Sequence, residues 1–270
     1  MYSANSHINY QLKIWLLILL SLIILIILVG GLTRLTDSGL SIVTWELFLG
    51  FLPPLTNDKW IDYFNLYKTI PEYQEQNFNM TLDEFKVIFW WEWSHRQLGR
   101  LIGLVTFLPL LYFTIKNGLW VVKRYGIIFL LVCLQGFFGW YMVSSGLVNR
   151  IDVSHYRLSI HLFTAFIILS IVFWNFLKLT QLQINQISIK SFFIKFFLVL
   201  LFMQLIIGAF VSGMDAGTIY NTWPLMGVSY FPDDSKIIEF LDITVFDNPS
   251  IVQFLHRNLA YLIMIVYIFL

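Results

Sequence analysis

The sequence predicts an all-α integral membrane protein made of two pseudo-symmetric four-helix bundles, the second of them incomplete. Hydrophobic residues make up 58% of the 270 residues and charged residues only 12%, which is more apolar surface than a soluble domain can bury. The apolar residues gather in runs long enough to cross a bilayer. One stretch near the N-terminus also recurs near the C-terminus, which predicts that two halves share one architecture.

Six apolar runs are candidate transmembrane helices. They cover residues 14–32, 98–115, 125–148, 158–177, 192–211 and 254–270. The first run is too long for the core of a signal peptide, and no small-residue cleavage site follows it. Lysine and arginine without any acid occupy the connections between runs two and three and between runs four and five. The positive-inside rule therefore places the N-terminus on the cytoplasmic or matrix side.

The long outer loop, residues 33–97, contains local folding signals. Asp37-Ser38-Gly39 is typical of a turn. Residues 60–67 have the pattern of a short amphipathic helix. Thr81-Leu82-Asp83-Glu84 has the spacing of a helix N-cap with acids in the first turn. Tryptophans at 90, 91 and 93 suit the membrane–water boundary, so we expect the second span to start near the sequence W-W-E-W-S-H-R-Q-L-G-R.

The segment from Gly30 matches the segment from Gly208 at one ungapped offset of 178 residues. The six identities are Asp37 with Asp215, Gly39 with Gly217, Thr44 with Thr222, Trp45 with Trp223, Leu47 with Leu225 and Pro54 with Pro232. The pair His95-Arg96 matches His256-Arg257 at an offset of 161 residues. We therefore expect a first unit over residues 1–180 and a second over 181–270 with an outer loop at 213–253.

Two histidines are candidate haem ligands. His95 stands at the predicted outer end of the second span, and His161 lies about one turn inside the fourth. Histidines at similar depth on two helices of one bundle can ligate a haem iron from both sides, whereas zinc would need further ligands. The alternative is that His95 only anchors a helix end at the interface. His7 is expected in solvent, and His155 is expected to be a loop or interfacial residue.

A carboxylate distinguishes the two halves. Glu92 and His95 are three residues apart and share one helix face, which Gly99 and Gly103 continue with room for a flat group. The counterpart of Glu92 in the second half is Gln253. A carboxylate can stabilise a cation or move a proton, and an amide cannot act as a base. The first half is therefore interpreted as the reacting site and the second as an electron-transfer site.

Other polar residues in and near the spans leave alternatives open. Four arginines near the outer helix ends could pair with porphyrin propionates or with outer acids: Arg100, Arg150, Arg157 and Arg257. Gln135 and Gln204 stand close to glycines, a pattern for which close helix packing is a sufficient explanation.

In combination, these stretches resemble the haem A synthase family, in its alphaproteobacterial and mitochondrial branch. The matching pieces are G-G-L-T-R-L-T-D-S-G-L-S-I-V-T-W, W-W-E-W-S-H-R-Q-L-G-R, L-Q-G-F-F-G-W-Y-M-V-S-S-G-L, Y-R-L-S-I-H-L, N-T-W-P-L-M-G and L-H-R-N-L-A-Y, from Gly30 to the end of the chain. The resemblance implies an enzyme that oxidises the C8 methyl of haem O to a formyl group. The product would be haem A for cytochrome oxidase.

The resemblance also implies site residues, cofactors and partners. His95 and His161 would face the substrate haem, Glu92 would be catalytic, and His256 would be one ligand of haem b. The implied partners are haem O, haem O synthase, cytochrome oxidase assembly factors, membrane lipid and an unidentified electron acceptor. The net charge of +1 gives no reason to expect nucleic acid. The implied location is the bacterial or mitochondrial inner membrane.

The end of the chain carries an expectation of its own. His161 follows His95 by 66 residues, so a counterpart following His256 would lie beyond Leu270. We therefore expect six of eight spans to be present, and this chain by itself to lose the second haem and to have little or no synthase activity.

Two other functions stay open at this point. A cytochrome b-type electron-transfer protein would bind haem without changing it, and the difference between Glu92 and Gln253 argues against this. A repeat-built transporter is disfavoured, because no span is broken at its midplane by glycine or proline.

Overall fold

The computed structural model describes the whole chain except residues 1, 47–48, 149 and 181–190. The described residues form helices and loops, with no β-strand among them. Six helices are long and apolar enough to cross a membrane. They are α1 (Tyr2–Leu35), α4 (Leu82–Asn117), α5 (Trp120–Gly146), α6 (His155–Thr180), α7 (Ser191–Gly213) and α8 (Pro249–Ile268). The prediction of an all-α membrane protein with six spans is confirmed.

Two long loops connect the spans, and both contain short helices. The first loop, residues 36–81, holds the 3₁₀ turn η1 (Leu49–Phe51) and the helices α2 (Asn57–Tyr67) and α3 (Pro71–Glu75). The second loop, residues 214–248, holds η2 (Ala216–Thr218), η3 (Ile237–Leu241) and η4 (Val245–Asp247). The amphipathic helix expected over residues 60–67 is thus confirmed as part of α2.

Helix α4 begins well before the apolar run that predicted it. Thr81 is its N-cap and forms a capping box with Glu84, as the local sequence predicts. The rings of Phe85 and Phe89 then pack against Phe64 and Trp60 of α2, with centroids 5.0 Å and 4.8 Å apart. Since the first turns of α4 are capped and covered in this way, the helix runs continuously through residues 90–100. The capping signal at Thr81 is thus confirmed, and the membrane boundary expected near residues 90–100 stays a prediction.

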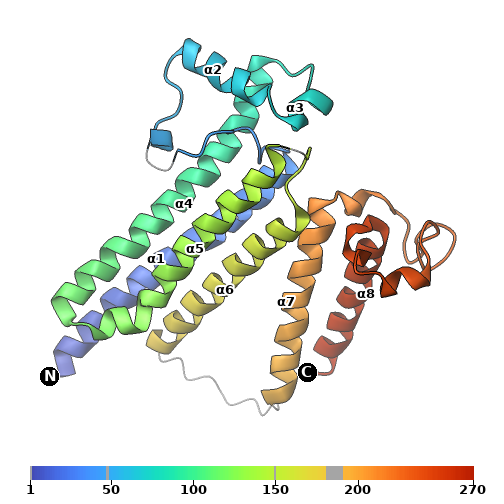
Figure 1. The fold of residues 1–270 in the computed structure, drawn as a ribbon. Coiled ribbons are helices and arrows are strands. Elements are labelled where there is room, and N and C mark those ends of the chain that lie inside the picture. The colour runs from blue at the N-terminus through green and yellow to red at the C-terminus, as the bar shows by residue number, and fades with distance from the viewer. Residues whose placement is uncertain (1, 47–48, 149, 181–190) are drawn as a thin grey trace. The chain divides into compact units, whose positions relative to one another are not determined.

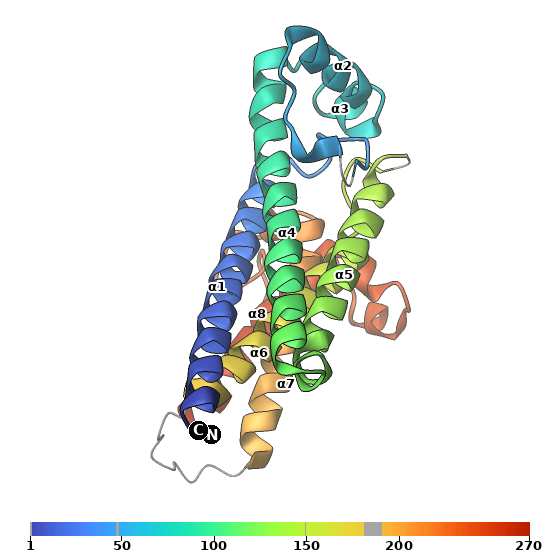
Figure 2. The ribbon, with the colours of Figure 1, turned by 90° about the vertical axis from the view of Figure 1, so that its left-hand side faces the viewer.

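The chain forms two compact units. The first contains residues 1–153 and 164–183, and the second contains residues 154–163 and 184–270, so α6 contributes to both. In the first unit α1 packs against α4 and α4 against α5, and Figures 1 and 2 show these three helices side by side. In the second unit α7 packs against α8. The expected division into bundles over residues 1–180 and 181–270 stays a prediction.

An apolar core holds the first unit together. Its buried side chains come from α1, α4, α5 and the part of α6 after residue 163; the largest are Trp15, Leu16, Leu19, Ile102, Phe113, Tyr125 and Ile128. Trp15 also donates from Nε1 to the backbone oxygen of Val105, at 2.8 Å. This bond satisfies the only polar atom of a ring that is otherwise surrounded by apolar side chains. The α1–α4 pair is therefore a firm base for the first loop.

The first loop contains a buried polar cluster. The Glu72 carboxyl is only 4% exposed. It accepts hydrogen bonds from the Tyr67 hydroxyl at 2.8 Å and from the Asn77 amide at 3.3 Å. Burial raises the pKa of Glu72 to about 8, although the bond from Tyr67 opposes the shift; the acids Glu92, Asp152 and Asp37 raise it further. At neutral pH the folded loop therefore holds this carboxyl largely protonated.

The raised pKa of Glu72 predicts that the first loop loses stability as pH rises. The folded state binds the proton more tightly than the unfolded state, whose ordinary value is 4.5. The stabilisation is therefore complete below about pH 4.5 and lost as pH rises through about 8. Protection factors of the α2 and α3 amides, in which the exchange rate is corrected for its base-catalysed intrinsic value, should be lower at pH 8.5 than at pH 5. Glu72→Gln should remove most of this difference. The matched control is Glu75→Gln, at an exposed position of α3, and equal pH dependence in both variants would contradict the prediction.

Candidate functional site

The carboxylate of Glu92 lies inside the first unit, where α4 meets the first loop. Glu92 is 3% exposed. Its Oε2 accepts from the Ser41 hydroxyl and from the backbone N–H of Ile42, both at 2.7 Å. Its Oε1 accepts from Arg96 Nη2 at 2.6 Å and from Arg96 Nε at 3.0 Å. Four donors therefore satisfy this buried carboxylate, and two of them belong to the Arg96 cation.

Arg96 binds the same loop segment by its remaining donors. Its Nη2 donates to the backbone oxygen of Ile42 at 2.7 Å, and its Nη1 donates to that of Thr44 at 3.1 Å. The guanidinium also lies over the Trp45 ring, 5.2 Å from its centroid. Glu92, Arg96 and the loop groups that they bind are called the first clamp below. It fastens residues 41–45 to α4 through both side-chain and backbone contacts.

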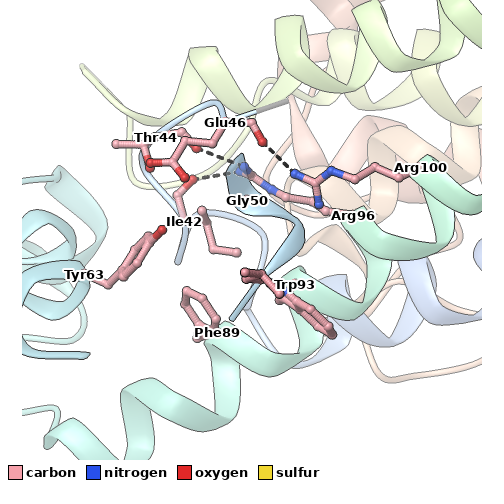
Figure 3. A pocket seen from close by; sticks show the side chains of 10 residues that line it. Ile42, Thr44, Glu46, Gly50, Tyr63, Phe89, Trp93, Arg96 and Arg100 are labelled. Atoms are coloured by element: carbon pink, nitrogen blue, oxygen red, sulfur yellow. Dashed lines mark hydrogen bonds between the residues drawn. The ribbon is translucent and has the colours of Figure 1, made fainter. Parts of the chain in front are cut away.

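A small pocket lies beside the first clamp. Figure 3 shows Arg96 and Arg100 pointing from α4 toward the segment that carries Thr44 and Glu46. Arg100 Nη2 donates to the backbone oxygen of Glu46 at 2.7 Å. This arginine therefore binds a loop carbonyl, and its pairing with a porphyrin propionate or an outer acid stays a prediction.

The second half repeats this arrangement with an amide. Gln253 of α8 accepts from the backbone N–H of Tyr220 at 3.2 Å and donates to the backbone oxygens of Tyr220 and Gly217, at 3.0 Å and 3.2 Å. Arg257 donates to the backbone oxygens of Tyr220 and Thr222, at 2.5 Å and 2.8 Å. Gln253, Arg257 and these loop groups are called the second clamp. Arg257 thus binds loop carbonyls, as Arg100 does.

The turns that lead into the two clamps also agree. Asp37 and Asp215, which correspond in the sequence repeat, both adopt the left-handed backbone conformation, with φ of 47° and 50°. Few residues other than glycine do so. Two matched clamps and two matched turns show that the repeated sequence folds in the same local way twice.

His95 lies on α4 one turn after Glu92, and its ring faces α1. A Cβ atom built on Gly30 of α1 would lie 3.2 Å from His95 Nε2. Further along α4, a Cβ on Gly99 would meet only Ile26, at 3.8 Å, and one on Gly103 would meet nothing within 4 Å. Gly103 therefore faces open space, whereas Ile26 lies against Gly99.

His256 lies on α8 against α7. Its Nε2 is 3.2 Å from the Gln204 amide nitrogen, and its Nδ1 is buried with no hydrogen-bond partner among the described residues. One ring nitrogen is thus held while the other is free of protein partners, which is how metal-ligating imidazoles are oriented. The residues present therefore fit a haem iron at this position. His161 is half-buried in α6. It belongs to the second unit whereas His95 belongs to the first, so joint ligation by this pair stays a prediction.

His155 lies at the start of α6, beneath the second loop. It is 3% exposed, and its Nε2 lies 3.3 Å from Asp247 Oδ1 of η4. The contact with a loop residue agrees with the expected loop or interfacial role, and the second loop adds the burial that the sequence did not indicate. Sequence reasoning also missed the roles of Ser41, Gly30 and Gln204 as partners of Glu92 and the two histidines. Comparing the two halves position by position could have indicated Gly30, since it corresponds to Gly208.

The structure defines a multi-pass helical membrane protein with the same arrangement in each half. A histidine stands one helical turn after the carboxyl or amide side chain that fastens the loop. Its helix packs against the first helix of that half. Proteins of this class hold prosthetic groups between their helices. The chain belongs to a family of cytochrome oxidase assembly proteins, whose family model matches residues 13–270.

Similar bacterial proteins carry the name heme A synthase. The protein of Pelagibacter ubique (strain HTCC1062) is 52% identical over 264 residues, which cover 97% of this chain and 78% of the relative. That of Parvibaculum lavamentivorans is 43% identical over 97% of this chain and 76% of the relative. That of Agrobacterium fabrum is 46% identical over 93% of this chain and 70% of the relative. No solved structure matches the chain.

The first clamp predicts a large loss of stability when Arg96 is removed. Arg96→Ala leaves the buried Glu92 carboxylate without its cation, which costs about 3–5 kcal/mol. Adding Glu92→Gln should restore part of this loss, because a buried amide carries no charge and Gln253 performs the same task in the second clamp. Denaturant unfolding in detergent micelles measures both values.

The control for the clamp prediction is Lys116→Ala, which removes an exposed cation from the other end of α4 and should change stability by less than about 0.5 kcal/mol. If the double variant were no more stable than Arg96→Ala, the carboxylate would not be the source of the loss.

Proposed function

We propose that this protein is a haem A synthase, which oxidises the C8 methyl of haem O to a formyl group and so supplies haem A to cytochrome oxidase. Membership of the family and the names of relatives up to 52% identical support this proposal. The structural observation that carries it is the difference between two otherwise matched clamps. The first holds a carboxylate one turn from His95, and the second holds an amide one turn from His256.

Comparing the two clamps separates two roles of the position that holds Glu92 in the first half and Gln253 in the second. One role is to fasten the loop, and the other is chemical. Gln253 shows that an amide is sufficient to fasten the loop. A carboxylate beside His95 adds negative charge, which stabilises positive charge developing on a substrate and can hold or move a proton. Glu92 is therefore assigned to the oxidation of the haem methyl group, and Arg96 and Ser41 hold its two oxygens in place.

The histidines are assigned to two haems. His95 and His161 ligate the iron of haem O, which is the substrate, and His256 ligates the iron of haem b. Haem b, when bound, supplies one-electron transfer. The open space beside Gly103 of α4 is consistent with a flat ring system on the helix face of His95.

The position in the cell follows from the same proposal. The six spans place the protein in a membrane, which we assign to the bacterial or mitochondrial inner membrane with the N-terminus on the cytoplasmic or matrix side. The inferred partners are haem O synthase, which makes the substrate, and assembly factors of cytochrome oxidase, which receive the product. The electron acceptor is a separate membrane component.

Extraction of the haems tests the proposal directly. The natural protein, purified from its own cells while they make haem O, should yield haem b together with haem O, haem A or partly oxidised derivatives, which chromatography separates. A cytochrome b-type electron carrier would yield haem b alone, and that result would overturn the proposal.

Replacing Glu92 tests its assigned role. Glu92→Gln should keep the loop fastened and both haems bound, and haem A formation should fall by about 10²–10⁴-fold, the usual contribution of a general acid or base. The matched control is Asp83→Asn, because the Asp83 side chain of the same helix is 90% exposed; this variant should keep normal haem A formation. Normal haem A formation by Glu92→Gln would show that the carboxylate is only mechanical.

A further inference from the structure

Each half presses its histidine ring against a glycine of its own first helix. Gly30 of α1 and Gly208 of α7 correspond in the sequence repeat, as do His95 and His256. A Cβ atom built on Gly30 would lie 3.2 Å from Nε2 of His95, and one built on Gly208 would lie 3.0 Å from Cε1 of His256. The same contact therefore occurs twice, at positions that correspond in the sequence repeat.

These contacts are closer than an ordinary van der Waals contact, so a larger residue requires the imidazole to move. Carbon atoms reach their best separation at about 3.5–4.0 Å, so an alanine methyl at either position would push the imidazole aside. Neighbouring glycines differ, since Cβ atoms on Gly31 of α1 and on Gly136 of α5 would meet nothing within 4 Å. Gly31 and Gly136 therefore have room for a methyl group that Gly30 and Gly208 lack.

Only the second half adds a hydrogen bond to this contact. Gln204 lies one turn before Gly208 on α7, and its amide nitrogen is 3.2 Å from His256 Nε2 and 3.3 Å from the His256 backbone oxygen. By half a turn about its last bond the amide can accept from a ring N–H instead, so Gln204 serves either ring tautomer. The corresponding residue in α1 is Ile26. No described residue forms a hydrogen bond with the His95 ring, and an isoleucine cannot supply one.

We propose that the first helix of each half sets the ring orientation of its haem-ligating histidine, through Gly30 or Gly208, and that Gln204 locks this orientation in the second half only. The inference rests on the proposed function, because it takes both histidines to be haem ligands. A ring that is already held loses little freedom on binding, which suits a haem that stays. A ring without a hydrogen bond can turn, which suits a substrate haem that enters and leaves. Gly30, Gly208 and Gln204 are positioning residues.

The alanine variants test the glycine contacts. Gly208→Ala should speed the loss of haem b to apomyoglobin by about 10- to 100-fold, the range for residues that orient metal ligands, and should shift the electron paramagnetic resonance signature of haem b alone. Gly30→Ala should disturb only the haem O signals. Gly31→Ala and Gly136→Ala are the controls and should change neither. Equal effects of Gly31→Ala and Gly30→Ala, or no effect of Gly208→Ala on either readout, would overturn the inference.

A reciprocal exchange tests the lock and adds no methyl beneath a ring. Gln204→Ile gives the second half the residue of the first, and should release haem b about 10- to 100-fold faster with a changed resonance signature. Ile26→Gln gives the first half the amide and should slow the release of its haem. Unchanged release in both variants would refute the lock. Failure of the proposed function is a different result, in which the unmodified protein yields no haem O or haem A, whereas failure of the inference leaves the haems present and the variants unaffected.

Discussion

The geometry of both candidate sites depends on two polar residues one turn apart that fasten a loop to a helix. In the first clamp Glu92 and Arg96 satisfy each other and also bind backbone groups of residues 41–45. A loop segment of this kind has backbone N–H and C=O groups that no helix pairs. Burying these groups without partners is costly. Side chains on α4 supply the missing partners. The histidine one turn along therefore stands on a helix whose position relative to its loop is settled.

The second clamp reaches the same mechanical result without a charge. Gln253 offers both a donor and an acceptor, so it can bind the N–H and C=O of Tyr220 together. A carboxylate only accepts, and Glu92 accordingly binds the donors of Ser41 and Ile42 and leaves the carbonyls to Arg96. The two halves thus share one frame but differ in electrostatics. Divergence of this kind lets one half take on chemistry while the other keeps a supporting role.

Sequence reasoning failed at places where a partner came from far away in the chain. The apolar run from Leu98 does not reveal the aromatic cover that α2 gives to Phe85 and Phe89 before the run begins. Arg257 binds carbonyls of the second loop, and nothing near it in the sequence indicates this contact. The sequence around His155 likewise gives no sign that η4 folds over it.

The sequence by itself determined the class of the protein, its six spans, the capping box of α4 and the correspondence between halves. Each of these depends on composition, on local spacing or on a comparison of the chain with itself. Only the tertiary structure decided what Glu92 binds, how the arginines are used, and that a glycine and an amide hold the ring of His256. Apart from the pair of Glu92 and Arg96, contacts of this kind join residues such as those 33, 52 and 54 positions apart. The direction in which a side chain points across such a distance is set by helix packing, which no local pattern encodes.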